Sequence, residues 1–439
     1  MGRTISCCDF LNNQYHDADV ISAYCWQRKT PLMTSVSTSE SSILSFPRFL
    51  RNTAATSSID WKRARLYALV AYLVSRLFVL AGGAIAVTTW ALQDKEEGKP
   101  AKNGLKMLIE YLDMWDGHWY LEVVRNGYPR VIQPDVTYFV SDARAAFFPL
   151  YPRLVHFFDL LLPGGPVWVS LLLNIILGGV FIYLAGRIAL VLFNAKVAER
   201  TMVLLCLFPG SFVLSFAYSE AIMLCLAALC LLALVRHAWV YAGVFALLAG
   251  LARPNGIALC LACAIACLIA IKERRDYLSL IAPLLAPWGY IGFMLFLRHH
   301  TNEPWAWFRV QNEAWEESTS FGGTAVIRTF DFFRSPFSSP TSLITAASIF
   351  VTVFLLYAAR KHKLPSIFFW YSIAILVLML IPATVTARPR FLYTAFPLFI
   401  SVAAMLRDED DRYWTLLVAS LSAGLVFISA LYGVYGAIP

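Results

Sequence analysis

An acidic residue stands in an unusual setting in the stretch WDGHWY, where Asp116 lies between a tryptophan and a glycine. A carboxylate that is partly withdrawn from water can take a proton from a hydroxyl group and act as a general base. Tryptophan rings offer flat apolar faces of the kind that sugars pack against, and glycine leaves room for a ligand to approach the backbone. We predict Asp116 as the catalytic base. The expected substrate-binding neighbours in this stretch are Trp115, Gly117, His118 and Tyr120.

Three arginines supply candidate partners for an anion. Arg253 lies in ARPNG, and Arg388 and Arg390 lie in TARPR. A guanidinium presents a planar fork of donors that suits phosphate, and a phosphate that leaves carbon must be stabilised as its bond breaks. A base and a phosphate clamp together predict group transfer from a phosphate-linked donor. Glu220, in AYSE, is a further expected member of the site.

The elements that position these residues are expected to be membrane-spanning helices. The chain has 439 residues, of which 59% are hydrophobic and 15% charged, which is far from the balance of soluble domains. The apolar runs are continuous rather than alternating, so helices are favoured over a barrel. We predict an all-α polytopic fold with about eleven spans. They are expected near residues 66–90, 166–189, 201–217, 220–235, 238–252, 255–271, 279–297, 342–359, 366–383, 391–406 and 413–436.

The positions of Lys and Arg indicate which loops share a side of the membrane. Six basic clusters lie on one side of the predicted spans, which is the cytoplasmic side by the positive-inside rule. They are WKRAR, which precedes the first span, and NAKVAER, RH, IKERRD, RKHK and RDEDDR, which follow later ones. The opposite side receives a long loop at about 91–165 that contains Asp116, together with Glu220, the three arginines and the loop at 298–317. Helical spacing of Leu112, Trp115, Trp119 and Val123 predicts an amphipathic helix along the membrane surface through WDGHWY.

Each site residue also has a simpler interpretation. Asp116 could be a helix N-cap or a solvated loop acid, and His118 could orient a neighbour or simply lie at the interface. Glu220 and the arginines could be interfacial anchors at helix ends. Five polar loops that converge on one side favour a site.

Several classes of protein and cofactor are excluded. The net charge of +8 is spread over short clusters, which does not suit nucleic acid. No Walker, Rossmann or HExxH motif is present, so no nucleotide, metal or other cofactor is implied. Cys260, Cys263 and Cys267 lie in an apolar run without His or acid and are interpreted as small core residues rather than zinc ligands.

The first 60 residues are rich in Ser and Thr and are predicted to form a disordered cytoplasmic tail. The start MGRTISCC matches a myristoylation pattern. A true start at Met33 is the alternative.

A resemblance to a known family covers roughly residues 64–439. It is carried by five stretches: WDGHWYLEVVRNGYP, AAFFPLYPRLV, FAYSEAIML, ARPNGIAL and RPRFLYTAFPLFI. The sequence resembles the PIG-V family of mannosyltransferases, in the GT-C superfamily, and most closely its bacterial members. The resemblance implies a single GT-C domain over residues 61–439. Gln311 and Trp315 fit the loop motif of the family as substrate-binding residues, whereas Asn302 and Glu303 depart from it, which leaves the acceptor open.

The resemblance also implies a reaction. A mannosyl residue would pass, with inversion, from a polyprenyl-phosphate donor to a hydroxyl of a lipid-linked or cell-envelope glycan on the non-cytoplasmic side. Asp116 would be the base, and Arg390 or Arg253 would stabilise the departing phosphate. The enzyme would lie among lipids of the plasma membrane in a bacterium, or of the endoplasmic reticulum in a eukaryote.

Two other classes of function remain as alternatives. A lipid or glycan transporter would also need many helices and a few buried charges, although transporters tend to show internal repeats, and none is evident here. A non-catalytic member of a glycosylation complex is the second alternative.

Overall fold

The computed structural model describes residues 58–384, 386–406 and 411–435. These residues belong to one of two compact units of the chain, Asn52–Pro439. In the described ranges the regular elements are all helices, and a single isolated bridge joins Thr319 and Pro382. The all-α fold is therefore confirmed. The predicted tail lies outside the described residues, except that residues 58–60 begin a helix, and the myristoylation pattern and Met33 also lie outside them.

Six helical stretches in the described part of the chain are long and apolar enough to cross a membrane. They are α4 (Ser58–Glu96), α8 (Pro166–Leu192), η4 with α12 (Pro254–Arg274), η5 with α13 and α14 (Tyr277–Thr301), α17 (Pro340–Lys361) and α21 (Asp411–Tyr435). A seventh span is formed if α9 (Ala195–Leu207) and η3 (Pro209–Ser215), bent by 75°, count as one. The shorter apolar helices are α10 (Glu220–Val235), α11 (Trp239–Ala252) and α18 (Ser366–Leu380).

The expected eleven spans are thus not confirmed as a count. The predicted span at 391–406 is divided into two short helices, α19 (Pro389–Thr394) and α20 (Pro397–Met405). A proline at the start of α20 has no N–H to continue the preceding helix, which explains the division. The first span is longer than predicted, because α4 runs to Glu96 rather than ending near residue 90.

The loop between α4 and α8 carries four helical pieces. They are α5 (Gly104–Asp113), α6 (Asp116–Asn126), η2 (Ser141–Ala146) and α7 (Leu150–Asp159). The prediction of one continuous amphipathic helix through WDGHWY is wrong, because the helix breaks between α5 and α6. Trp115 adopts a φ of 57° at this break, in the left-handed half of the backbone map that a right-handed helix cannot contain. The break places Asp116 at the start of α6.

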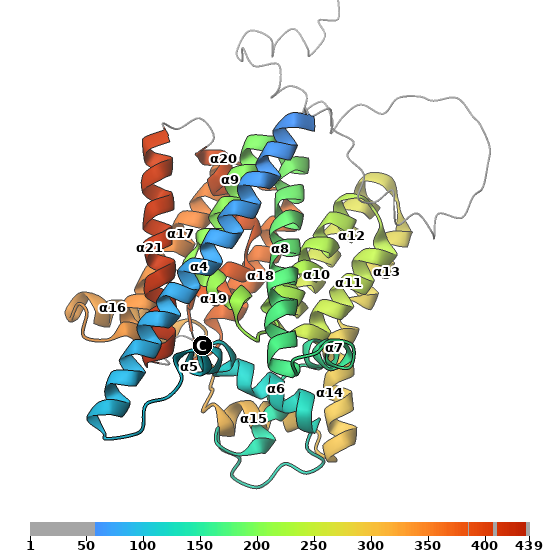
Figure 1. Cartoon of the computed structure of the whole chain (residues 1–439). Coiled ribbons are helices and arrows are strands. Elements are labelled where there is room, and N and C mark those ends of the chain that lie inside the picture. The colour runs from blue at the N-terminus through green and yellow to red at the C-terminus, as the bar shows by residue number, and fades with distance from the viewer. Residues whose placement is uncertain (1–57, 385, 407–410, 436–439) are drawn as a thin grey trace, which may run out of the picture. The chain divides into compact units, whose positions relative to one another are not determined.

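The short helices of this loop gather at one end of the helical core. In Figure 1, α5, α6, α7 and α15 (Ala306–Ala314) lie together at the lower end, whereas α4 begins at the opposite end. Within the core, α4 packs against α21 and α9, and α10 packs between α8 and α11. α16 (Gly323–Arg334) lies along α17.

A buried arginine holds the bend between α9 and η3. Arg76, within α4, is 7% exposed. Its Nη1 donates to the Ser211 carbonyl at 2.8 Å and to Ser215 Oγ at 2.9 Å, and its guanidinium lies 5.1 Å from the Tyr72 ring centroid. A bend frees backbone groups from helical bonding, and apolar surroundings demand that they find other partners. Arg76 supplies such partners.

We expect Arg76→Leu to destabilise the protein. The change leaves the Ser211 carbonyl and the Ser215 hydroxyl without this donor, and an unsatisfied buried polar group costs about 1–3 kcal/mol. Thermal unfolding in detergent should show a clear drop in the midpoint. Lys62→Gln, at an exposed position on the same helix, serves as the control and should leave the midpoint unchanged. Equal midpoints for both variants would contradict this role.

Candidate active site

Asp116 is the first residue of α6, and its side chain is 14% exposed. Its Oδ2 lies 2.9 Å from Arg390 Nη1 and 4.0 Å from Arg253 Nη2. The N-cap position of α6 is Trp115, which makes no side-chain capping bond. The carboxylate at a helix start is favoured by the helix dipole, but it pairs with arginine. The geometry therefore favours a site over a cap or a solvated loop acid.

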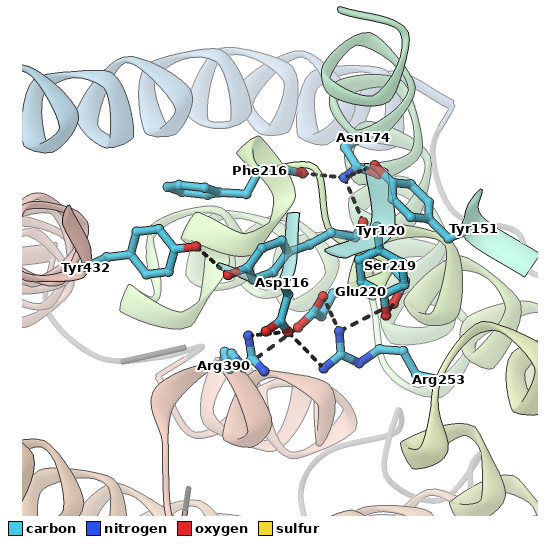
Figure 2. A network of polar contacts seen from close by, with 11 residues as sticks. Asp116, Tyr120, Tyr151, Asn174, Phe216, Ser219, Glu220, Arg253, Arg390 and Tyr432 are labelled. Carbon is cyan, nitrogen blue, oxygen red and sulfur yellow. Dashed lines mark hydrogen bonds and ion pairs between the residues drawn. The ribbon is translucent and has the colours of Figure 1, made fainter. Parts of the chain in front are cut away.

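Glu220 is the first residue of α10 and completes a cluster of four charges. Its side chain is 1% exposed, and its Oε2 lies 2.7 Å from Arg253 Nη1. Its Oε1 lies 3.9 Å from Arg390 Nε. Figure 2 shows the two acids and the two arginines turned toward one another. Two negative and two positive side chains balance, which is what burial of charges in an apolar protein requires.

The ion pairs of this cluster leave hydrogen-bonding capacity unused. Neither carboxylate oxygen of Glu220 is in hydrogen-bond geometry with a partner, and the same holds for Nε and Nη1 of Arg390. The short distances therefore describe charge contacts whose N–H groups do not point at the oxygens. Charge-assisted hydrogen bonds are among the stronger polar contacts in proteins. The cluster thus keeps strong donors and acceptors that can turn toward a substrate.

An asparagine in the middle of α8 fixes the backbone that precedes Glu220. Asn174 Nδ2 donates to the carbonyl of Tyr218 at 2.7 Å, to that of Phe216, and to the Tyr151 hydroxyl at 3.1 Å. These carbonyls belong to the non-helical turn between η3 and α10, which has no helical bonding of its own. Asn174 therefore sets the direction in which α10 starts and so the position of Glu220 (Figure 2).

A tyrosine of the last helix ties together the two chain breaks at the site. The Tyr432 hydroxyl is hydrogen-bonded to that of Tyr218 and donates to the Met114 carbonyl at 3.2 Å. Gly117 adds a close contact between the same segments, because a Cβ there would lie 3.3 Å from the Cβ of Ala217. The space that we expected a ligand to use at Gly117 is thus filled by Ala217 on the side where a Cβ would project.

Tyr120 and Ser219 join the network from the side of α6. The Tyr120 hydroxyl is hydrogen-bonded to Ser219 Oγ, and Arg253 Nη1 donates to the same oxygen at 3.3 Å. Tyr120 is 3% exposed and its ring stands edge-on to that of Tyr151. The structure therefore brings Tyr120 to the charge cluster, where it orients Arg253 through the serine.

The predicted tryptophans form an aromatic group next to Asp116. Tyr138 lies 6.3 Å from Trp115 and 5.7 Å from Trp315, measured between ring centroids, and Trp119 lies 6.2 Å from Trp315. Trp315 comes from the distant loop after α15, so the two predicted loops meet here. His118 is exposed, with its ring 5.1 Å from that of Trp119.

In the loop at 298–317, Gln311 and Glu303 make contacts within the loop itself. Gln311 lies on α15, where its carbonyl accepts from the Glu317 N–H at 3.2 Å. Asn302 ends α14 with a φ of 56°, a conformation that asparagine tolerates. Glu303 Oε1 lies 2.6 Å from Arg309 Nε. The two departures from the family motif thus support the connection between α14 and α15.

Arg388 is buried two residues before Arg390 of the four-charge cluster. It is 4% exposed, and its Nε and Nη1 have no hydrogen-bond partner. Burial, together with the charges of Arg328 and Arg390, lowers the pKa of the Arg388 guanidinium to about 10. Arg328, on α16, is a residue of this region that the sequence did not single out.

Other residues of the site were also missed. Asn174 was the one with an available signal, because a polar residue inside an apolar run is usually functional or structural. Among the described residues, no group of three or more His, Cys, Asp or Glu side chains could hold a metal ion.

A family model described as Mannosyltransferase (PIG-V) matches residues 68–285, about half of the chain. The protein belongs to the PIG-V family. The matched range contains Asp116, Glu220 and Arg253, while Arg390 lies beyond it. The membership confirms the predicted family, whose model is described as a mannosyltransferase.

Comparison with curated protein sequences finds no match. Among solved structures, the PIG-V protein is similar to the oligosaccharyltransferase of Archaeoglobus fulgidus. The apo form shares 15% identity, with a TM-score of 0.40 over 82% of this chain and 55% of that one. The form tethered by a disulfide bond to an acceptor peptide with the NVT sequon also shares 15% identity, with a TM-score of 0.36 over 73% of this chain and 50% of that one. The chain thus spans about half the length of the proteins it matches.

We expect Arg253→Met to destabilise the PIG-V protein strongly. The change leaves Glu220 buried with Arg390 alone at 3.9 Å, and breaking a buried ion pair costs about 3–5 kcal/mol. The double variant Arg253→Met with Glu220→Gln should recover much of the loss, as measured by thermal unfolding in detergent.

The matched control for this test is Arg309→Met. Arg309 pairs with Glu303 at 2.6 Å, but both side chains are more than a quarter exposed, and exposed pairs contribute about 0–1 kcal/mol. A double variant no more stable than Arg253→Met would show that the pair is not coupled in this way.

Proposed function

We propose that this PIG-V protein transfers a mannosyl residue from a polyprenyl-phosphate-mannose donor to a hydroxyl of a lipid-linked or cell-envelope glycan. The observation that carries the proposal is the buried cluster in which the Asp116 carboxylate meets Arg390 at 2.9 Å. A carboxylate next to guanidinium groups provides a proton acceptor and a stabiliser of negative charge within one small volume. The family membership supports mannose as the transferred sugar.

The proposed reaction is a single displacement. Asp116 takes the proton of the acceptor hydroxyl, and the oxygen forms a bond to the anomeric carbon of the mannose. The bond from that carbon to the phosphate oxygen breaks, and its electron pair leaves with the polyprenyl phosphate. Arg390 or Arg253 stabilises the negative charge that develops there. A β-linked donor then yields an α-mannoside, and no cofactor takes part.

The aromatic group beside Asp116 supports binding of a sugar. Trp115 and Trp315 approach Tyr138 from two loops, and such rings present flat faces to the apolar side of a hexose. We assign the contacts with the transferred sugar or the acceptor glycan to this group. Gln311 and His118 stay predicted substrate-binding residues on the same group of loops.

The site is proposed to face away from the cytoplasm. α6, which begins at Asp116, and α15, which ends just before Trp315, lie at the end of the core opposite to the start of α4 (Figure 1). The basic cluster WKRAR lies near the start of α4. Positive charge favours the cytoplasmic side. The plasma membrane of a bacterium or the endoplasmic reticulum of a eukaryote fits this arrangement.

We expect Asp116→Asn to abolish mannosyl transfer, because the amide cannot accept the proton of the acceptor. The assay uses purified protein, radiolabelled polyprenyl-phosphate-mannose and membrane glycolipid acceptors, with thermal unfolding as the check on folding. Asp113→Asn is the matched control: Asp113 lies three residues away, at the end of α5. Burial raises the pKa of the Asp113 carboxyl to about 6, which makes it the competing candidate for a general base.

Three results would change the proposal. Loss of transfer in Asp113→Asn with near-normal turnover in Asp116→Asn would move the base to Asp113. Counterflow of the lipid across vesicles without product would favour a transporter. A protein that neither transfers sugar nor moves lipid would fit a non-catalytic member of a glycosylation complex.

A further inference from the structure

Arg388 has donors without acceptors in a place where water has little access. It is 4% exposed, and its Nε and Nη1 are buried without a hydrogen-bond partner. A buried polar group that lacks a partner costs about 1–3 kcal/mol, and a charged one costs more. Arginine almost always keeps its charge. Such a residue is expected where a ligand supplies the missing acceptors.

The chain brings a second arginine to this place through an extended contact between two loops. The segment before α16 runs beside the end of α18: Thr319 forms a bridge with Pro382, and the Ser320 N–H donates to the Ile381 carbonyl at 2.8 Å. Arg328 Nη1, on α16, donates to the Thr384 carbonyl at 2.9 Å. The contact therefore holds α16 against the segment that leads to Arg388.

The charges around Arg388 favour an anion. Arg328 and Arg390 both lower the pKa of its guanidinium, and Glu317 offsets them in part. Glu317 is shared, because its Oε1 also accepts the Thr384 N–H at 2.7 Å. Asp116 pairs with Arg390 in the other cluster. With Arg390 paired to Asp116, the charges of Arg388, Arg328 and Glu317 leave a net charge of +1, which a singly charged phosphate diester would neutralise.

The position of α16 indicates a lipid as the source of that phosphate. One face of the helix is apolar and open, with Val326, Ile327, Phe330 and Phe333 each 55–70% exposed. Its Ala325 is buried, and the helix packs along the span α17. A helix with an apolar outer face lies in the membrane interface, at the depth of lipid head groups. By this argument Arg328 is expected at the depth of the phosphates of membrane lipids.

We propose that Arg388 and Arg328 form a binding site for the phosphate of a polyprenyl-phosphate lipid, which reaches the site along the apolar face of α16. The inference rests on the proposed function, since it assigns the donor phosphate of that reaction to these residues. Arg390, which pairs with Asp116 at 2.9 Å, then contacts the oxygen that leaves the sugar. The remaining phosphate oxygens accept from Arg388 and Arg328, whose planar donors suit them.

The test measures binding rather than transfer. Farnesyl phosphate is titrated into the full chain in dodecyl maltoside, a detergent without phosphate, with farnesol and inorganic phosphate as the other two ligands. The variants are Arg388→Gln and Arg328→Gln. Arg334→Gln is the control, because Arg334 is exposed in the last turn of the same helix. Each site variant should weaken farnesyl phosphate at least about tenfold, the size of a lost charge-assisted contact.

The comparison of ligands separates the possible sources of the anion. Farnesyl phosphate should bind more tightly than either farnesol or inorganic phosphate, and Arg334→Gln should bind it as the unaltered protein does. Inorganic phosphate that binds as tightly as the lipid would overturn the assignment to a lipid. Unchanged affinity in Arg388→Gln would overturn the site itself. If this variant fails to fold, Arg388→Lys keeps the charge and should still weaken binding, because it loses the planar fork.

Failure of this inference differs from failure of the proposed function. If the protein binds farnesyl phosphate through Arg388 but transfers no mannose, the phosphate site is supported and the proposed function is contradicted. If the protein transfers mannose and the Arg388→Gln variant has an unchanged KM for the donor, the proposed function is supported and the phosphate site is contradicted.

Discussion

The constraint on which the structure depends is the burial of four charges that must neutralise one another. Glu220 is 1% exposed and Arg390 is 5% exposed, and an ion withdrawn from water without a partner costs several kcal/mol. Asp116 and Glu220 each begin a helix. Two helices must therefore start at one level, facing two arginines from other parts of the chain. The loops before α6 and α10 place the two helix starts so that their carboxylates face the arginines.

The helix starts at Asp116 and Glu220 each follow a break in the chain, and buried polar side chains stabilise both. Asn174 of α8 donates hydrogen bonds to two carbonyls just before Glu220. Tyr432 of α21 donates to the carbonyl of Met114, two residues before Asp116. Backbone groups freed within an apolar core need such partners. The spans α8 and α21 thus contribute to the site through Asn174 and Tyr432, which hold the backbone next to the charged residues.

The sequence was informative about the charges and less so about the backbone. Asp116, Glu220, Arg253 and Arg390 stand out as charges beside apolar runs, and the structure brings all four together. The break at Trp115 could not be predicted, because tryptophan carries none of the freedom of glycine that marks a positive φ. Arg328 was missed for a related reason. An arginine on an amphipathic surface helix gives no signal in the sequence. Only the tertiary contact of Arg328 with Thr384 brings it to the segment that leads to Arg388.

The positions of Arg388 and Arg390 depend in turn on a close contact of the backbone deep in the core. A Cβ at Gly210, in η3, would lie 2.3 Å from the carbonyl oxygen of Pro389, which no side chain could tolerate. Glycine therefore lets the segment with both arginines lie against η3. Ser211, the next residue, is the one whose carbonyl Arg76 holds at 2.8 Å. The Pro-Gly interruption of the apolar run at Pro209 is thus best understood as the close contact that positions the segment with Arg388 and Arg390.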